Sequence, residues 1–152
     1  MGERIDIAAL MGQGVAVIVA TRDKQLRPEI ARAWAPSLSD DGARFSVCVE
    51  AAPDSAMARN LEAGGPVAAM ISRLAEVASI QLKGRVVEVD APTQDRLDEV
   101  AEHVDRFVAE TALVGVREAT ARALVGPALL AVTMQLTERL DETPGAGAGR
   151  AL

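Results

Sequence analysis

The stretch Val77–Val89, "VASIQLKGRVVEV", decides the fold because apolar and polar residues alternate along most of its length. A β-strand points successive side chains to opposite faces of its sheet. One face of this stretch has the composition of a core: Ile80, Leu82, Gly84 and Val86. The other face carries hydrogen-bond donors: Ser79, Gln81, Lys83 and Arg85. We therefore expect a long strand with a row of donors on one side.

The donor row has two readings that the residues alone leave open. Lysine and arginine on a sheet edge deter edge-to-edge aggregation, and a solvated edge would look like this. Converging cations and amides are also what an anionic ligand needs. The same row could therefore be one wall of a binding site.

Five further strands are expected on either side of this one. Apolar or alternating runs bounded by turn residues predict them. They are Gly14–Thr21, Glu29–Leu38 with Pro36 as an edge or bend, Arg44–Glu50, Pro66–Arg73 and Ala128–Leu140. Most of the connections have hairpin length, which favours an antiparallel barrel or sandwich.

Helices are expected in four places, too few to cross over a parallel sheet. They are Asp6–Met11, a segment capped by Asp54 or Ser55 and stopped by Gly64 and Gly65, Thr93–Glu110 and Arg117–Val125. In the third, Leu97, Val100, Ala101, Val104, Phe107 and Val108 form an apolar stripe at helical spacing. The pattern predicts an α+β protein in which six strands form an antiparallel barrel or sandwich with peripheral helices, one domain over residues 1–152 with a glycine-rich tail at 143–152.

Composition excludes several classes of function. The net charge is −6, and three aromatic residues with no tyrosine cannot build stacking platforms, so we expect no nucleic-acid partner. No signal peptide or membrane-spanning run is evident, and we expect a cytoplasmic protein without a membrane partner. Cys48 stands alone in an apolar strand and is interpreted as a buried hydrophobic residue.

No catalytic group emerges from the side chains. One cysteine and one histidine cannot make a zinc site, so no metal is expected. His103 is interpreted as a partly exposed helical residue. The carboxylates of the same helix, Glu99, Glu102, Asp105 and Glu110, are interpreted mostly as a solvated face. Any chemistry would then come from a cofactor.

Several segments, in order, resemble a known family. They are "GVAVIVATRDKQLRPEIARAW" (14–34), "ARNLEAGGPVAAMISR" (58–73), "SIQLKGRVVEV" (79–89) and "TPGAGAG" (143–149). Together they resemble the pyridoxamine 5'-phosphate oxidase-like family of FMN-binding split barrels, and more narrowly its small bacterial members. The likeness spans about Gly14 to Gly149.

The resemblance implies a six-stranded antiparallel split β-barrel with peripheral helices, which forms a two-fold homodimer with FMN in a groove at the subunit interface. It implies that basic and hydroxyl side chains hold the phosphate, and that Ser79 and Gln81 contact the flavin. The residues that it favours for cofactor binding are Arg32, Ser79, Gln81 and Lys83, followed by Arg73 and Trp34. It also implies a flavin-dependent oxidoreductase acting on a small substrate that the sequence does not identify.

The sequence departs from the family's oxidases at some positions, so alternatives stay open. Arg32 is followed by "AWAPSL" without the lysine expected there, and "DETPGAGAGRAL" lacks the arginine and histidine of the substrate-binding end. Pyridoxine-phosphate oxidation itself is therefore not expected. The alternatives are a barrel that binds a deazaflavin or haem, with His103 as a possible haem ligand, and a cofactor-free dimer acting as a binding protein.

Overall fold

A computed structural model describes residues 5–152 of the chain. Its strands are β1 (Ala16–Arg22), β2 (Pro28–Leu38), β3 (Arg44–Glu50), β4 (Pro66–Arg73), β5 (Ala78–Asp90), β6 (Leu129–Asp141) and β7 (Arg150–Ala151). Its helices are α1 (Ile7–Met11), α2 (Ala56–Glu62), α3 (Gln94–Ala112) and α4 (Glu118–Arg122). All six expected strands and all four expected helices are present.

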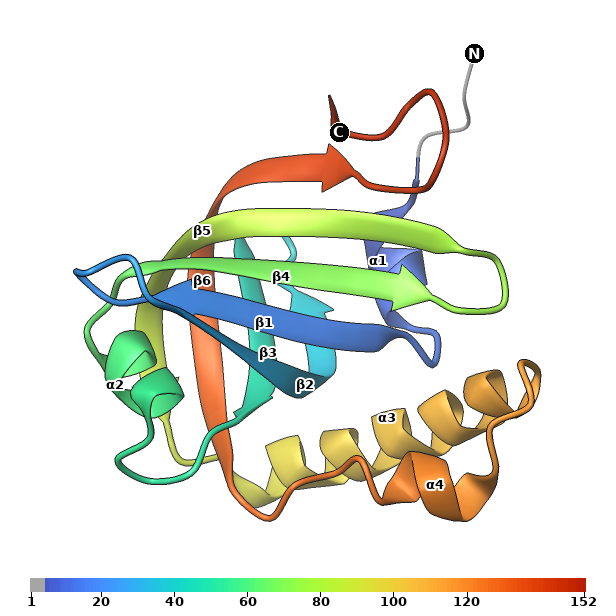
Figure 1. Cartoon of the computed structure of the whole chain (residues 1–152), viewed down its shortest axis with the longest axis horizontal. Coiled ribbons are helices and arrows are strands. Elements are labelled where there is room, and N and C mark those ends of the chain that lie inside the picture. The colour runs from blue at the N-terminus through green and yellow to red at the C-terminus, as the bar shows by residue number, and fades with distance from the viewer. Residues whose placement is uncertain (1–4) are drawn as a thin grey trace.

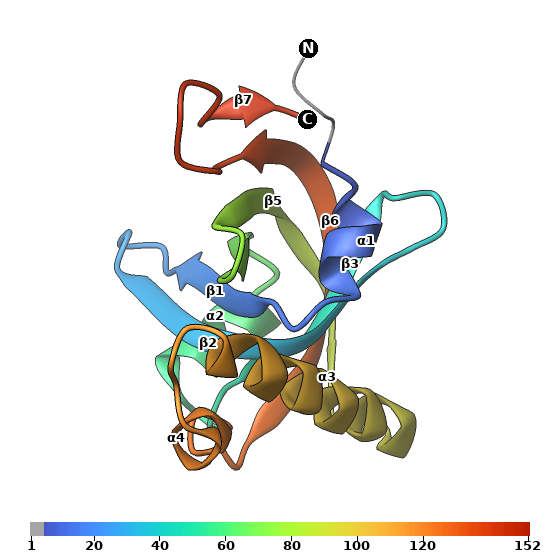
Figure 2. The same ribbon diagram turned by 90° about the vertical axis from the view of Figure 1, so that its right-hand side faces the viewer.

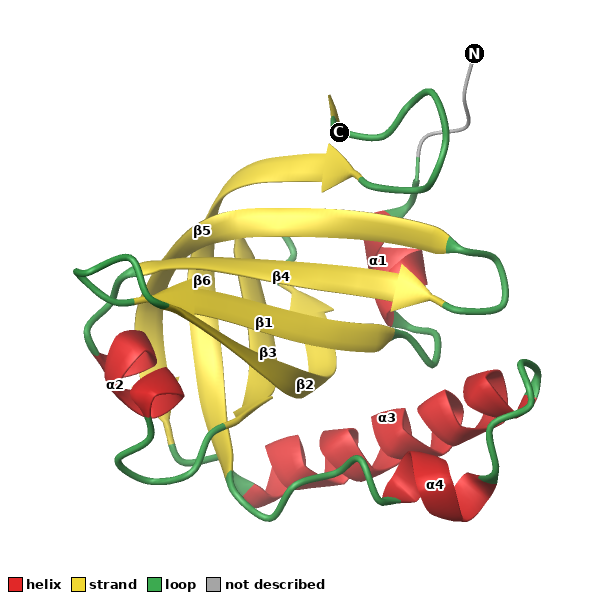
Figure 3. Ribbon diagram, in the orientation of Figure 1, coloured by secondary structure: helices red, strands yellow, loops and turns green. Residues whose placement is uncertain are grey.

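The six long strands form a closed antiparallel barrel (Figures 1 and 3). The order across the sheet is β3-β2-β1-β4-β5-β6-β7, and a further pairing of β3 with β6 closes it. Every strand pair is antiparallel. The predicted α+β split barrel is confirmed.

The barrel core is filled by the inward side chains of every long strand. Val17, Val19, Ala69, Ile71, Ile80 and Leu82 are all at most 1% exposed. Gly84 also faces inward, at a bulge between Lys83 and Gly84, and any Cβ there would meet the backbone carbonyl of Gln135 on β6. The inward face predicted for β5 is therefore confirmed, and glycine lets β6 approach it closely.

A second apolar cluster lies between the barrel and α3, which runs beneath β2 together with α4 (Figure 2). Trp34 sits at its centre, 1% exposed, with edge contacts to Phe107 and His103. Its Nε1 donates to Oε1 of Glu50 at 2.7 Å. Cys48 is fully buried in the same cluster, and burial raises the pKa of its thiol. The interpretation of Cys48 as a core residue is confirmed.

The interpretation of His103 as partly exposed is wrong, because its side chain is fully buried. The backbone N–H of Ala35 donates to Nδ1 at 2.9 Å, which leaves Nε2 to donate to the carbonyl of Val15 at 3.0 Å. His103 therefore ties α3 to the start of β1 and the middle of β2. Its position three residues after Val100 and four before Phe107 places it on the apolar stripe.

Burial lowers the pKa of His103 to about 4, and the nearby charge of Arg106 adds to this effect. The imidazole is thus neutral in the folded protein and titrates near 6.5 once unfolded. Below pH 6.5 the unfolded state binds a proton that the folded state does not. The contribution of His103 to the free energy of unfolding is therefore full above pH 6.5 and is lost as the pH falls toward 4. We expect His103 to account for a loss of about 2–3 kcal/mol over that range. Urea unfolding of the native chain and of His103→Asn, measured from pH 8 to pH 4, would isolate the part of the pH dependence that comes from His103. Parallel pH profiles in the two proteins would contradict the assignment.

The carboxylate of Glu110 also departs from the expected solvated face of α3. It is 8% exposed and accepts a hydrogen bond from Nε of Arg73 at 3.1 Å, while its Oε2 has no partner within residues 5–152. Glu110 lies three residues after Phe107, so it falls on the buried side of the helix.

The glycine-rich tail folds back onto the barrel. β7 pairs with the end of β6, opposite Leu140 and Asp141. Ser79 donates its backbone N–H to Oγ1 of Thr143 at 3.1 Å, which joins the start of the tail to β5. Along residues 5–152, no helix combines the length and apolar character needed to cross a bilayer.

Candidate cofactor site on the outer sheet face

The site is built by three cross-strand rows on β1, β4 and β5. The register aligns Ala16 with Ser72 and Ser79, Ile18 with Met70 and Gln81, and Ala20 with Ala68 and Lys83. Paired residues share a face of the sheet. The inward neighbours on these strands are buried, so these nine side chains point away from the barrel, and each is half-buried. We call these nine residues the outer face.

The outer face is largely apolar and bordered by donors. Its β1 and β4 positions are mostly alanine, isoleucine and methionine, and Ile30, paired with Ala20, extends it onto β2 with a side chain 69% exposed. Its β5 edge is Ser79, Gln81 and Lys83. Figure 1 shows β1, β4 and β5 with no helix over them. The donor row predicted from alternation therefore borders an uncovered apolar surface.

One end of the outer face opens into a cavity of about 610 Å³. Small residues, Ala20 and Ala68, contribute to its lining. Three cations also line it: Arg22, Lys83 and Arg85. Lys83 forms an exposed ion pair with Glu138 at 3.3 Å, a contact that costs little to break. These cations supply the donors that a phosphate needs.

A second cavity, of about 680 Å³, shares Arg22, Pro66 and Arg85 with the first. It adds Lys24, Arg27 and Arg59 from the β1–β2 turn and α2, although Asp23 neutralises Arg27 by a 2.6 Å ion pair. The sequence analysis missed Arg22 and Arg59. Arg22 could have been found, because alternation along β1 puts Ile18, Ala20 and Arg22 on one face.

At the opposite end, Ser79 is held by its neighbours. Its hydroxyl lies 2.9 Å from that of Ser72 across the β4–β5 pair. Its backbone N–H donates to Oγ1 of Thr143 in the C-terminal tail. Ser79 and Gln81 therefore present a fixed polar edge beside the apolar floor.

The other predicted site residues do not gather with Lys83. Arg32 shares the row of Ile18 but lies three strands from Gln81, about 14 Å away at ordinary strand spacing, and its guanidinium stacks 5.8 Å from the Phe107 ring centroid. Arg73 is engaged by Glu110 and by Glu76, the latter at 2.7 Å. Trp34 is enclosed beneath α3. The structure brings together only Ser79, Gln81 and Lys83.

Comparison with solved structures places this geometry in a known fold. An F420 reductase matches with a TM-score of 0.57 and 14% identity, over 90% of this chain and 98% of its own. A Clostridium acetobutylicum protein of the pyridoxinephosphate oxidase family, related to general stress protein 26 of B. subtilis, matches with a TM-score of 0.50 and 13% identity, over 90% of this chain and 84% of its own. The chain has the pyridoxamine 5'-phosphate oxidase-like split-barrel fold.

A third split barrel, an FMN-binding protein from Syntrophomonas wolfei, matches with a TM-score of 0.51 and 14% identity, over 88% of this chain and 82% of its own. At these identities the likeness establishes the fold. No protein-family model matches the chain, and no curated protein does. The family resemblance seen in the sequence is thus confirmed at the level of the split barrel.

The residues of this split barrel fit a flavin-type cofactor better than haem. A planar ring needs an apolar floor with hydrogen-bonding groups at its edge, and the row of Ile18, Met70 and Gln81 provides both. A phosphate group needs cationic donors, and Arg22, Lys83 and Arg85 supply them at one end of the outer face. His103, by contrast, uses both ring nitrogens within the chain and is fully buried. The possible haem ligation by His103 is therefore ruled out in this fold.

Proposed function

We propose that the protein is a homodimer that binds FMN at the outer face and uses it in a redox reaction on a small substrate. The phosphate would lie among Arg22, Lys83 and Arg85, and the ring toward Gln81 and Ser79. The observation that carries the proposal is an uncovered apolar sheet face that ends in a cavity lined by three cations, in a chain of net charge −6.

The apolar character of the outer face supports the dimer. A monomer seldom leaves a contiguous apolar sheet surface uncovered, and such a surface usually marks an interface. Ile30, which is 69% exposed on the β2 side of this face, would meet its counterpart across a two-fold axis, next to the flavin floor formed by Ile18 and Met70. A cofactor at the margin of that interface would be shielded from water on both sides.

The protein's part in the reaction would be binding and orientation. The bound flavin would accept or donate a hydride or electrons. Arg22, Lys83 and Arg85 would neutralise the phosphate, and Lys83 would exchange its contact with Glu138 for the ligand. Gln81 can donate to and accept from polar ring atoms, since its amide carries both kinds of group.

FMN titration tests the cofactor half of the proposal. We expect the native chain to retain an FMN absorption spectrum after unbound cofactor is removed. The double variant Lys83→Ala, Arg85→Ala should bind FMN about 100-fold more weakly, because each charge-assisted contact contributes about 1.5–3 kcal/mol. Arg44→Ala, Arg117→Ala is the matched control, since it removes two exposed arginines that line neither cavity.

Equal FMN affinity in the two double variants would place the phosphate elsewhere. A native chain that retains no FMN would overturn the FMN assignment, and the same titration with the deazaflavin F420 would then separate a deazaflavin protein from a cofactor-free binding protein. Light scattering tests the dimer independently. Ile30→Asp, which lies outside the flavin floor, should convert a dimer to a monomer, whereas a native monomer would overturn the interface.

A further inference from the structure

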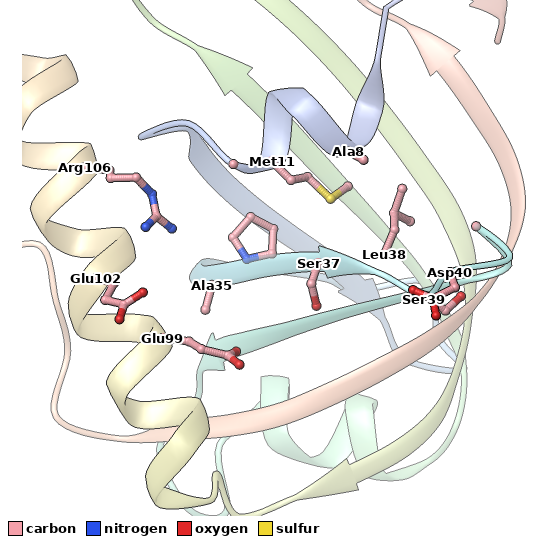
Figure 4. Close-up of a pocket in the computed structure, with 13 residues that line it drawn as sticks. Ala8, Met11, Ala35, Ser37, Leu38, Ser39, Asp40, Glu99, Glu102 and Arg106 are labelled. Atoms are coloured by element: carbon pink, nitrogen blue, oxygen red, sulfur yellow. The ribbon is translucent and has the colours of Figure 1, made fainter.

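A cleft of about 660 Å³ lies between α1, β2 and α3, away from the outer face (Figure 4). It shares no lining residue with the two basic cavities. Its apolar lining comes from Ala8 and Met11 of α1 and from Ala35, Pro36 and Leu38 of β2. We call it the α3 cleft.

One wall of the α3 cleft carries both signs of charge. Glu99, Glu102 and Arg106 project from α3 toward β2 (Figure 4). Glu99 is paired with Arg96, but neither Glu102 nor Arg106 takes part in an ion pair within residues 5–152. The four-residue spacing of Glu102 and Arg106 would allow them to pair with each other, but they do not do so here. Both charges are therefore available to a ligand.

The opposite wall is fixed in an uncommon backbone conformation. Ala35 has a φ of +53°, in the left-handed region, at a bulge between Trp34 and Ser37. His103 accepts from its N–H, and Nη2 of Arg96 donates to its carbonyl at 3.0 Å. These bonds hold Ala35 and Pro36 against α3. A surface held in this way loses little conformational freedom when a ligand binds.

We propose that the α3 cleft binds a small zwitterion with an apolar side chain, of the amino-acid class. Arg106 would bind the carboxylate, for which the planar guanidinium offers two parallel donors. Glu102 would bind the ammonium group. The two side chains start one helical turn apart, about 6 Å along the axis, and can reach both ends of one amino acid. The apolar side chain would cover Met11 and Pro36.

Calorimetric titration of the full chain with L-leucine and L-phenylalanine tests the proposal. Isoamylamine and isocaproate serve as leucine analogues that lack the carboxylate or the ammonium group. We expect the amino acids to bind and each analogue to bind at least about tenfold more weakly, because each analogue lacks one of the two charge-assisted contacts. No heat of binding from either amino acid up to about 10 mM would overturn the proposal. Equal binding by either analogue would do the same.

Variants assign the binding to the cleft. Arg106→Gln and Glu102→Gln should each weaken L-leucine binding by about tenfold or more, and both sites are exposed, so the fold is retained. Arg117→Gln and Asp95→Asn are matched controls outside the cleft and should leave binding unchanged. Ala8→Phe, which fills the cleft and keeps its charges, should abolish binding. Full binding by Ala8→Phe, or an equal loss in the controls, would count against the site.

Discussion

His103→Leu is expected to lower the free energy of unfolding by about 4 kcal/mol at pH 8, because it orphans two buried backbone groups. The N–H of Ala35 and the carbonyl of Val15 both bond to the imidazole. Leucine offers neither group a partner and buries both away from water. Urea unfolding followed by circular dichroism measures the loss.

His103→Asn is the control for that measurement. Its side-chain carbonyl can take the place of Nδ1 and accept from Ala35, while the bond to Val15 is lost. We expect its stability to lie between those of the native chain and of His103→Leu. If asparagine and leucine destabilise equally, the bond to Ala35 contributes nothing, and the role given to it in fixing Ala35 fails with it.

Gly84→Ala is expected to lower the free energy of unfolding by about 3 kcal/mol or more, because there is no room for a methyl group at this position. The new Cβ would collide with the carbonyl of Gln135, and the third-nearest contact, Cα of Leu136, is also backbone. Backbone of a paired strand cannot yield as a flexible side chain would. The β5–β6 pairing must open at the bulge, on the strand that carries Lys83.

Gly12→Ala is the matched substitution for Gly84→Ala. Gly12 has an ordinary helical φ of −71°, and a Cβ there would be 3.4 Å from its nearest neighbour. Its stability should change by no more than about 0.5 kcal/mol. Thermal unfolding of both variants compares them directly. Similar losses of stability in the two variants would mean that position 84 requires glycine for its backbone flexibility and not for the close approach of β6.

Alternation and turn residues predicted the six strands, and the family resemblance then favoured a split barrel over a sandwich. The bounds expected for β3 and β4 match those observed, and Thr93 caps α3 by accepting from the N–H of Arg96. The bulge at Ala35 could not be predicted in detail. Pro36 signalled an irregularity, but the left-handed conformation of Ala35 depends on His103, which lies 68 residues further along the chain.

Less of the candidate site was predictable, since it depends on strand order and on side-chain partners. Alternation correctly joined Ser79, Gln81 and Lys83. It could not show that β1 and β4 lie between Arg32 and that row, or that Glu110 engages Arg73. Trp34 was a second-tier cofactor residue named with the family resemblance, but it is buried beneath α3. A lone sequence does not reveal which sheet face a distant helix will cover.

The closing role of β6 has a consequence for how the protein is made. β6 pairs with β3 on one side and with β5 on the other, and it follows the other five barrel strands in the sequence. Until it emerges, β3 and β5 present open edges that can pair with another nascent chain. Synthesis that stops before Leu129 would therefore yield an aggregation-prone product. The addition of β6 therefore converts an open, aggregation-prone sheet into a closed barrel.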